Sequence, residues 1–363
     1  MKRKLSSQSQ LALTWRKFKR NRLAQVGMLI VGILLLVTLF APFFEPYDYN
    51  EIRFSKAYVP PQRIHFFDQR GRFHFLPFTY KLERGMNPET YTLKYTENTS
   101  KKYRVRFFVH TWKYKLFGVF KSDLHLFGIE KGGTIFLLGT DSQGRDLLSR
   151  IIQGARISIL VALLGGFIST VVGSVVGAIS GYYSGVMDLL LQRIVELIQC
   201  FPQIPLWMAL SAAIPRWWPP IYVLYGVVGI FALLSWPTLA REVRGKTLSY
   251  RREDSVLAAK ALGASDIRII TKHILPRSTS HIIVTATLII PQLIIAESTL
   301  SFLGLGIQPP MVSWGVLLHD AQNLQTLGQH PWIMIPGLFI AITVLGFNFL
   351  GDGLRDAADP YAQ

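Results

Sequence analysis

The chain has 363 residues, of which 50% are hydrophobic and only 17% are charged, a balance that argues against an average soluble domain. The formal net charge is +17, but the basic residues cluster beside apolar runs and not on one amphipathic face among aromatic side chains. This arrangement predicts a lipid bilayer as a partner and no nucleic acid. The single cysteine, Cys200, excludes an internal disulfide, and the eight histidines lack ligand spacing, so we expect no metal and no cofactor.

Residues 1–23 form a basic tail that we expect in the cytoplasm, with eight Lys or Arg and no acidic residue. Residues 24–44 are mostly apolar and long enough, at about 1.5 Å per residue, to cross a hydrocarbon core of about 30 Å. A cleaved signal peptide would have a shorter apolar centre and a small-residue cleavage site, which Pro42 and the residues after it do not provide. The sequence therefore predicts a retained first span.

Residues 45–138 predict a small β-rich insert outside the membrane. Aromatic and β-branched residues alternate with charged ones, most clearly over 103–109. Residues 66–73 predict a hairpin that turns at Gly71, and residues 97–101 predict a second turn. We hypothesise that this insert contacts another protein of the same assembly.

Residues 138–160 predict a helix that lies at the membrane surface before it enters the second span. Asp146, Arg150 and Arg156 fall on one polar side of this helix, and the residues on the other side are mostly apolar.

The second span covers about 157–182 and has a stripe of small residues at Gly173, Gly177 and Gly181. In lipid, small residues four apart allow two helix backbones to approach closely. We therefore expect these glycines to pack against a neighbouring helix; flexibility alone is the other interpretation.

The third and fourth spans are predicted at about 189–214 and 219–240. Pro202 and Pro205 interrupt the hydrogen bonds of the third span, which membranes tolerate where protein or a cavity covers the backbone. The later stretch Gly245-Lys246-Thr247 lacks the earlier glycine and the strand of a phosphate-binding loop, so the chain is not expected to be an enzyme that hydrolyses ATP.

The polar loop at 253–278 predicts two short helices joined by a glycine. Ser255 is a suitable N-cap for the first helix, and Gly263 supplies the left-handed conformation that ends it. Ser265 can cap a second helix, which Pro276 is expected to end.

The first of these helices has a small apolar face formed by Ala258, Ala261 and Leu262 at i, i+3 and i+4 spacing. Such a face fits a groove in another protein, or lies on the lipid surface.

The fifth span, about 281–302, contains Gln292, Glu297 and Ser298. An ionisable group inside a span costs about 2.5–3.5 kcal/mol or more, so it usually faces a cavity or a partner. The three residues are therefore candidates to line a transport pathway, and hydrogen bonding of Glu297 to an adjacent helix is an equally supported role. The last span covers about 332–350.

Charge asymmetry fixes the expected topology. The loop at 241–280 has nine Lys or Arg, whereas the loop at 304–331 has none. Six spans with both termini in the cytoplasm satisfy the positive-inside rule, although the turn at 184–188, expected in the cytoplasm, has no basic residue.

The loop at 253–278 resembles the EAA loop of ATP-binding-cassette (ABC) importer permeases, E-A-A, three residues, Gly, nine residues, I-x-L-P. The matching residues are Ala258, Ala259, Gly263, Leu275 and Pro276. Leu257 stands where the family has Glu, and His273 stands where it has Ile.

Two further stretches resemble the oligopeptide/dipeptide/nickel (DppC/OppC-like) branch of these permeases. The first is G-T-D-x-x-G-R-D-x-x-S-R-x-x-x-G-x-R-x-S, carried by Gly139, Asp141, Gly144, Arg145, Asp146, Ser149, Arg150, Gly154, Arg156 and Ser158. The second is E-x-x-L-S-F-L-G-L-G, followed by Q-P-P and S-W-G, over residues 297–315.

The resemblance implies an all-α polytopic membrane protein with about six spans and a type I ABC-importer permease fold, interrupted by the β-rich insert. Residues 139–352 would form the permease core, and 353–363 a cytoplasmic tail. The partners implied are a second permease subunit (DppB/OppB-like), two ABC ATPase subunits and an extracytoplasmic solute-binding protein, in the cytoplasmic (inner) membrane of a bacterium or archaeon.

The resemblance also implies which residues couple the chain to the ATPase, namely Leu257, Ala258, Ala259, Leu262, Gly263, Leu275 and Pro276. Peptide, nickel and oligosaccharide importers share these motifs, so the solute stays open. A self-contained secondary transporter would show inverted repeats and several charges in mid-membrane, and a membrane enzyme centred on 45–138 would need a nucleophile and base there. We find neither pattern in the sequence, and predict an importer permease.

Overall fold

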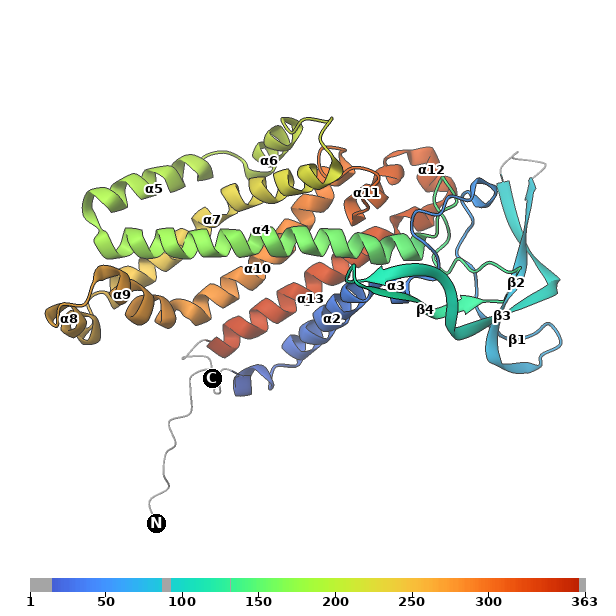
Figure 1. The fold of residues 1–363 in the computed structure, drawn as a ribbon, viewed down its shortest axis with the longest axis horizontal. Helices are drawn as coiled ribbons and strands as arrows, with labels where there is room; N and C mark the ends of the chain where they lie inside the picture. Colours follow the sequence, from blue (N-terminus) through green and yellow to red (C-terminus); the bar gives the residue numbers. More distant parts are fainter. Residues whose placement is uncertain (1–14, 87–92, 131, 359–363) are drawn as a thin grey trace, which may run out of the picture. The chain divides into compact units, whose positions relative to one another are not determined.

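The computed structural model describes residues 15–86, 93–130 and 132–358 (Figure 1). In these ranges, five helical stretches are long and apolar enough to cross a membrane, namely Arg22–Leu39, Leu147–Tyr183, Pro220–Tyr250, Asp266–Phe302 and Pro331–Ala357. A pair of shorter helices bent by 82° makes a sixth crossing if the pair is one span. The predicted helical membrane fold is therefore supported, with five to six apolar helices.

The chain divides into two compact units. One, which we call the helical unit, comprises Met1–Ile33, Ser158–Pro310 and Ile340–Gln363. The other, the mixed unit, comprises Leu34–Ile157 and Met311–Phe339 and contains the β-rich insert.

The helical unit consists of consecutive helices with short connections. Three helices lie in it for the greater part of their length, namely α2 (Arg22–Leu39), α4 (Leu147–Tyr183) and α13 (Ile335–Ala358). The others lie wholly in it, namely α5 (Gly185–Gln199), α6 (Gln203–Ala212), α7 (Pro220–Tyr250), α8 (Asp254–Ala261), α9 (Asp266–Ile269), a π-helical turn (Ile270–Ile274) and α10 (Leu275–Phe302). Figure 1 shows α7 and α10 running beside α4. The core between them is apolar, with Phe231 of α7 and Ile294 of α10 fully buried. Because lipid tails are as apolar as these side chains, close packing stabilises this core.

Helices α2 and α13 approach closely because glycines stand at their contact. A Cβ atom at Gly27 would lie 2.6 Å from the backbone nitrogen of Leu350, and one at Gly346 would lie 2.7 Å from a methyl carbon of Ile30. Small residues at a helix contact are what membrane helices use in place of a hydrophobic driving force.

The third predicted span is broken and not continuous. Helix α5 ends at Gln199, and α6 begins at Gln203 after a bend of 82°. Pro202 is the N-cap of α6 and Pro205 lies within its first turn, where the missing N–H groups cost no intrahelical hydrogen bond. The fourth span, by contrast, continues as α7 to Tyr250, beyond its predicted end at 240.

The prediction that Pro276 ends a helix is wrong. Helix α9, the π-helical turn and α10 follow one another without a gap, so the helix runs from Asp266 to Phe302. Pro276 falls in the first turn of α10, directly after the π-helical turn, in which the Leu275 N–H donates to the Ile270 carbonyl oxygen five residues earlier. The wider turn accommodates the proline ring that a regular α-helix would exclude. The N-cap of α8 also differs, because it is Glu253 and not Ser255.

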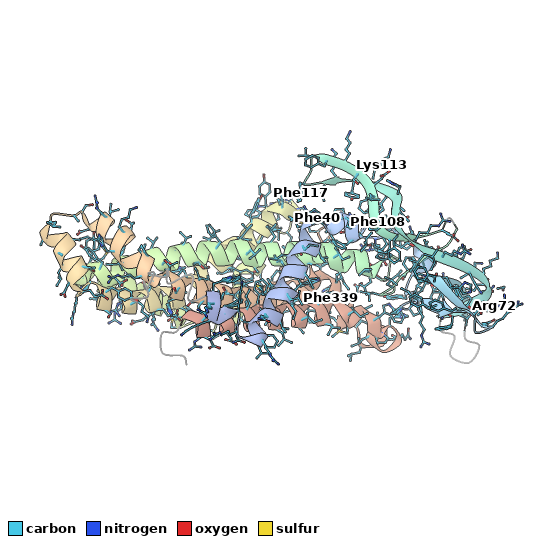
Figure 2. All side chains as sticks on the ribbon, turned by 90° about the horizontal axis from the view of Figure 1, so that it is seen from below. Phe40, Arg72, Phe108, Lys113, Phe117 and Phe339 are labelled. Atoms are coloured by element: carbon cyan, nitrogen blue, oxygen red, sulfur yellow. The ribbon has the colours of Figure 1, made fainter. Side chains whose placement is uncertain are left out.

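The insert is a four-stranded antiparallel sheet with the order β1–β2–β3–β4. The strands are β1 (His65–Phe67), β2 (Phe73–Met86), β3 (Leu93–Leu116) and β4 (Phe120–Ile129). The predicted hairpin at Gly71 is confirmed, since Phe67 pairs with Phe73 and Gly71 has φ +72°. Figure 2 shows Arg72, beside this turn, at one end of the insert, and Phe108, Lys113 and Phe117 towards the other.

The second predicted turn, at 97–101, is wrong, because these residues lie inside β3. The pairing passes from Tyr80–Lys102 to Lys81–Asn98, which leaves extra residues in β3 as a bulge. The Asn98 side-chain oxygen accepts a hydrogen bond of 3.0 Å from the Ser100 N–H. The turn-forming residues therefore bend the strand locally and do not reverse it.

The segment before α4 is polar but buried, which corrects the predicted surface helix. Asp146 and Arg150 are 3% and 4% exposed. Asp141 accepts hydrogen bonds from Arg145 Nε, at 2.7 Å, and from Arg150 Nη1. The helix begins only at Leu147, where Asp146 Oδ2 accepts from the Ser149 N–H at 2.8 Å and acts as the N-cap. Arg150 on the predicted polar side therefore pairs with Asp141, and Asp146 caps the helix, so neither side chain faces the membrane surface.

Candidate functional site

The loop between α7 and α10 is built on a small apolar core. Val256 of α8 is 2% exposed and packs against Ile269 and Ile274, which are fully buried. Tyr182 and Tyr250 cover the same cluster from the ends of α4 and α7. Because these contacts come from four separate elements, α8 is fixed to the ends of the long helices and is not a loosely attached loop.

Gly263 joins α8 to α9 in a left-handed conformation with φ +78°. The Ala264 N–H donates to the Ala259 carbonyl oxygen at 3.1 Å, as in a Schellman-type helix end. A Cβ atom on Gly263 would meet no atom within 4 Å. Glycine is therefore needed here for its backbone conformation and not for space.

The face of α8 that points away from this core is apolar and exposed. We call Leu257, Ala258, Ala261 and Leu262 the loop surface; Leu257 is 52% exposed and Leu262 is 88% exposed. Ile267, which follows the glycine turn, is 73% exposed. Among the described residues no side chain covers these groups, and exposed apolar groups at one place usually mark a binding surface.

Several contacts connect the loop to the membrane helices. Arg277 of α10 forms an ion pair with Glu253 at the start of α8. The Tyr182 hydroxyl of α4 donates to Asp266 of α9 at 2.7 Å. Leu275 packs into a second apolar cluster, which includes Ala178 of α4, Leu239 and Val243 of α7, and Ile270. Of the other residues predicted in the coupling site, Pro276 and Ala258 are exposed and Ala259 is half-buried. A displacement of α8 would therefore act on α4, α7 and α10 together.

The three glycines of α4 lie against α7. A Cβ at Gly173 would lie 2.8 Å from the Trp236 carbonyl oxygen, and a Cβ at Gly177 would lie 2.4 Å from the Ala240 carbonyl oxygen. At Gly181 it would lie 2.7 Å from Thr247 Cβ. The two helices thus touch backbone to backbone, which larger residues at these positions would prevent.

Glu297 is fully buried in α10 and accepts two hydrogen bonds. Ser158 of α4 donates to one carboxylate oxygen at 2.7 Å, and Ser301 donates to the other at 2.7 Å. This geometry favours the interpretation in which Glu297 joins neighbouring helices. Ser298 is 5% exposed with no hydrogen-bond partner for its hydroxyl among the described residues, and Gln292 is exposed.

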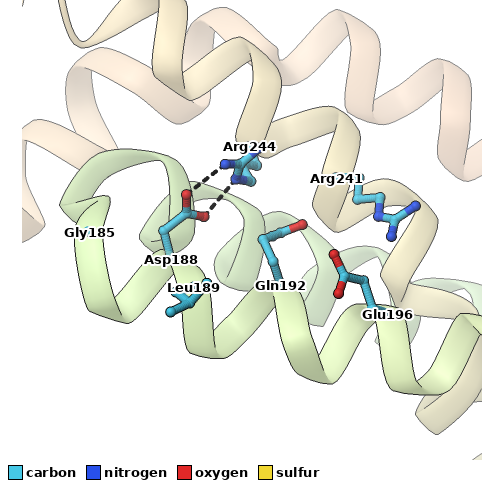
Figure 3. A pocket seen from close by; sticks show the side chains of 7 residues that line it. All are labelled: Gly185, Asp188, Leu189, Gln192, Glu196, Arg241 and Arg244. Carbon is cyan, nitrogen blue, oxygen red and sulfur yellow. Dashed lines mark hydrogen bonds and ion pairs between the residues drawn. The ribbon is translucent and has the colours of Figure 1, made fainter.

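An ion pair that the sequence did not predict lines a groove between α5 and α7 (Figure 3). Asp188 and Arg244 face each other there, with Glu196 and Arg241 further along the same groove. Their separation of 56 residues leaves no local pattern to detect. The sequence offers one indication of this pair: Asp188 and Arg244 are both charged residues next to an apolar run, where a partner is expected.

Two sequence profiles match the chain. The profile described as "Binding-protein-dependent transport system inner membrane component" matches residues 173–362. The profile described as "N-terminal TM domain of oligopeptide transport permease C" matches residues 9–61. Between them lie residues 62–172, which include most of the insert.

Curated relatives match over most of their length. The oligopeptide transport system permease protein OppC of Bacillus subtilis is 30% identical over 345 residues, which covers 95% of this chain and 87% of the relative. The dipeptide transport system permease protein DppC of Lactococcus lactis is 33% identical over 350 residues, which covers 96% and 90%. OppC of Haemophilus influenzae is 44% identical over 223 residues, which covers 61% and 69%.

Proposed function

The chain belongs to the inner membrane components of binding-protein-dependent transport systems, and we propose that it forms half of a peptide pathway that a separate ATPase drives through the loop surface. As a member of this family it is a permease subunit of an ABC importer, and not an enzyme, since ATP hydrolysis in such importers belongs to another subunit. The solute and the coupling site are parts of our proposal. The names of the relatives, which are oligopeptide and dipeptide permeases, support peptides as the solute.

One observation supports the coupling role, namely the exposed apolar face of α8, which lies next to the start of the continuous helix Asp266–Phe302. Leu262 is 88% exposed although it is apolar, and burial of such a side chain in a partner is favourable by about 1.5–3 kcal/mol. A helix that exposes apolar side chains in this way is suited to a groove in another protein. We infer that the groove belongs to the ATPase subunit.

The connection to the spans supports the transmission of movement. The helix that begins at Asp266 continues to Phe302, and Glu253 and Asp266 are tied to α10 and α4. When the two ATPase subunits close on ATP, the one that holds α8 would displace it, and the helices attached to α8 would move with it. In this proposal Gly263 sets the angle between α8 and α9, while Leu275 and Pro276 occupy the start of the moving span.

The proposed complex contains a second permease subunit, two ATPase subunits and an extracytoplasmic solute-binding protein. We propose that both termini lie in the cytoplasm, because the first 23 residues carry eight basic residues and the loop at 241–280 carries nine, whereas the loop at 304–331 carries none. Among the candidate pathway residues, we assign the exposed Gln292 to a surface that faces the pathway or the second permease, and the buried Ser298 to the interior of the helical unit. We assign Glu297 to the joint between α4 and α10.

Transport in proteoliposomes tests this function. The chain is reconstituted with its partner permease, ATPases and binding protein, and uptake of a radiolabelled oligopeptide is compared with uptake of nickel. We expect peptide uptake that requires both ATP and the binding protein. Nickel uptake in its place would favour the metal importers of the same branch, and peptide uptake by the chain alone, without ATP, would favour a secondary transporter.

A further inference from the structure

The turn between β3 and β4 exposes a group of apolar side chains. Turns that face water are rich in Gly, Asn, Asp, Pro and Ser. Here Phe117, Val119 and Phe120 surround Gly118 and are 48%, 74% and 66% exposed. We propose that this turn is seated in the lipid headgroup region, on the side of the membrane where the first span ends, and anchors the insert to the bilayer.

Two ring contacts place the hairpin beside the end of the first span. The ring of Phe117 lies 5.9 Å from that of Phe40, the residue directly after α2. The ring of Phe108 lies 6.5 Å from that of Phe43, in the short helix α3 (Ala41–Phe44). Figure 2 shows Phe40, Phe108 and Phe117 near one another. The hairpin therefore contacts the chain where it leaves the membrane.

His125 of β4 fixes this placement. It is fully buried, and its two ring nitrogens each lie 2.9 Å from a backbone carbonyl oxygen, one of Pro42 in α3 and one of Trp112 in β3. The rings of Trp112 and Tyr114 pack against the imidazole at 4.9 and 5.1 Å. A hairpin held in this way cannot swing freely away from the end of the span.

The depth of the turn follows from the exposed residues of α2. Leu36 and Leu39, in the last turn of the span, are 51% and 52% exposed and apolar, as expected for side chains that face lipid. Phe40 follows immediately, and Phe117 touches it from the side. Phe117 therefore lies at the level where acyl chains give way to headgroups, which is where aromatic side chains are enriched in membrane proteins.

Basic side chains flank the turn. Lys113, Lys115 and Lys121 are exposed on the two strands next to it. Long cationic side chains at this depth reach towards anionic headgroups and are attracted to a negatively charged surface. The nearby acidic residue Asp123 is paired with His110 at 2.6 Å. The combination of an apolar turn with basic flanks fits a bilayer with anionic lipid better than a protein groove.

A fluorescent probe at the turn tests the proposal without any need for transport. The complete importer, with Cys200→Ser and Val119→Cys in this chain, is labelled with an environment-sensitive nitrobenzoxadiazole group and placed in vesicles that contain phosphatidylglycerol. Lipids with a nitroxide near the top of the acyl chain then quench probes within the interface. The matched control is Arg72→Cys at the opposite end of the insert.

We expect the nitroxide lipid to quench the probe at 119 at least about twofold more than the probe at 72, with iodide in the water showing the reverse order. Joint replacement of Lys113, Lys115 and Lys121 by Gln is expected to lower the quenching at 119 in anionic vesicles to its level in neutral ones. Equal iodide access at 119 and 72 would overturn the proposal. So would shielding of position 119 that needs the solute-binding protein, because the turn would then dock on a protein.

Discussion

Arg244 of α7 binds Asp188 of α5 through two hydrogen bonds, from Nε to Oδ1 and from Nη2 to Oδ2, each 2.6 Å long. Asp188 is the last residue of the turn at 184–188, which has no basic residue of its own. Arg251, also beyond the apolar part of α7, donates to the Tyr182 carbonyl oxygen at 3.3 Å and to Ser184. The positive charge that this turn lacks in the sequence is thus supplied by another helix.

Removal of this pair should loosen α5 from α7. We expect Asp188→Asn to lower the stability of the purified chain by about 1–2 kcal/mol, because Arg244 loses a charged bidentate partner and is about one-third exposed. Thermal unfolding in detergent, followed by tryptophan fluorescence, measures the effect. Arg193→Gln is the control, since its pair with Glu196 has exposed fractions of 71% and 48% and should contribute little. Equal losses in the two variants would contradict this role.

The close approach of α4 to α7 makes Gly177 sensitive to any side chain. A Cβ there would lie 2.4 Å from the Ala240 carbonyl oxygen and 2.9 Å from Val243 Cβ, so Gly177→Ala must push the helices apart. We expect a loss of about 1–3 kcal/mol in unfolding free energy. Gly245→Ala in α7 meets no atom within 4 Å and should be neutral or slightly stabilising. If Gly177→Ala unfolds at the same temperature as the unaltered protein, α4 and α7 do not pack as closely at Gly177 as described here.

The conformation of Gly263 should matter for coupling. A β-branched residue strongly disfavours φ +78°, so Gly263→Val should reorient α8 at a cost of about 1–3 kcal/mol. We expect peptide uptake in proteoliposomes to fall about tenfold while ATP hydrolysis continues, so that more ATP is used per peptide. Gly263→Asn is the control, because asparagine tolerates this conformation and the site has open space. Normal uptake by the valine variant would count against the coupling role.

The pH dependence of stability should report on Glu45, which follows α3. Burial, with a smaller contribution from the negative charge of Asp48, raises the pKa of the Glu45 carboxyl to about 8. The folded protein therefore holds this proton over a range in which the unfolded chain has released it, and stability falls as the pH rises from the ordinary carboxyl range towards 8. Glu45→Gln should make the unfolding temperature depend less on pH in this range. At pH 8 the variant should unfold at a higher temperature than the unaltered protein. An unchanged slope between pH 5 and 8 would show that Glu45 is not the group responsible.

Local patterns in the sequence predicted the features that depend on local chemistry. Hydropathy located the spans, because a membrane helix must be apolar along its own length. Gly71 and Gly263 marked a hairpin turn and a helix end, since each needs a positive φ that other residues avoid. The exposed face of α8 also followed from the helical spacing of Ala258, Ala261 and Leu262.

Features that depend on contacts distant in the chain could not be predicted in this way. Residues 97–101 had the composition of a turn, but Glu97 and Asn98 pair with β2, and only residues 99–101 form a bulge in β3. Asp146 and Arg150 had the spacing of a polar helix face, yet they are buried, and the Arg150 side chain pairs with Asp141. Pro276 had the position of a helix end, but the π-helical turn before it allows the helix to continue.

Site-directed cross-linking of α8 tests the central claim most directly. A photoreactive maleimide is attached to Leu262→Cys in a Cys200→Ser background, irradiated in native membranes, and the linked partner is identified by mass spectrometry. Trp217→Cys, 83% exposed and next to the opposite end of α7, is the control. We predict that position 262 links to an ABC ATPase subunit and position 217 does not. A probe at 262 that links to lipid or to other proteins, and never to an ATPase, would contradict the account.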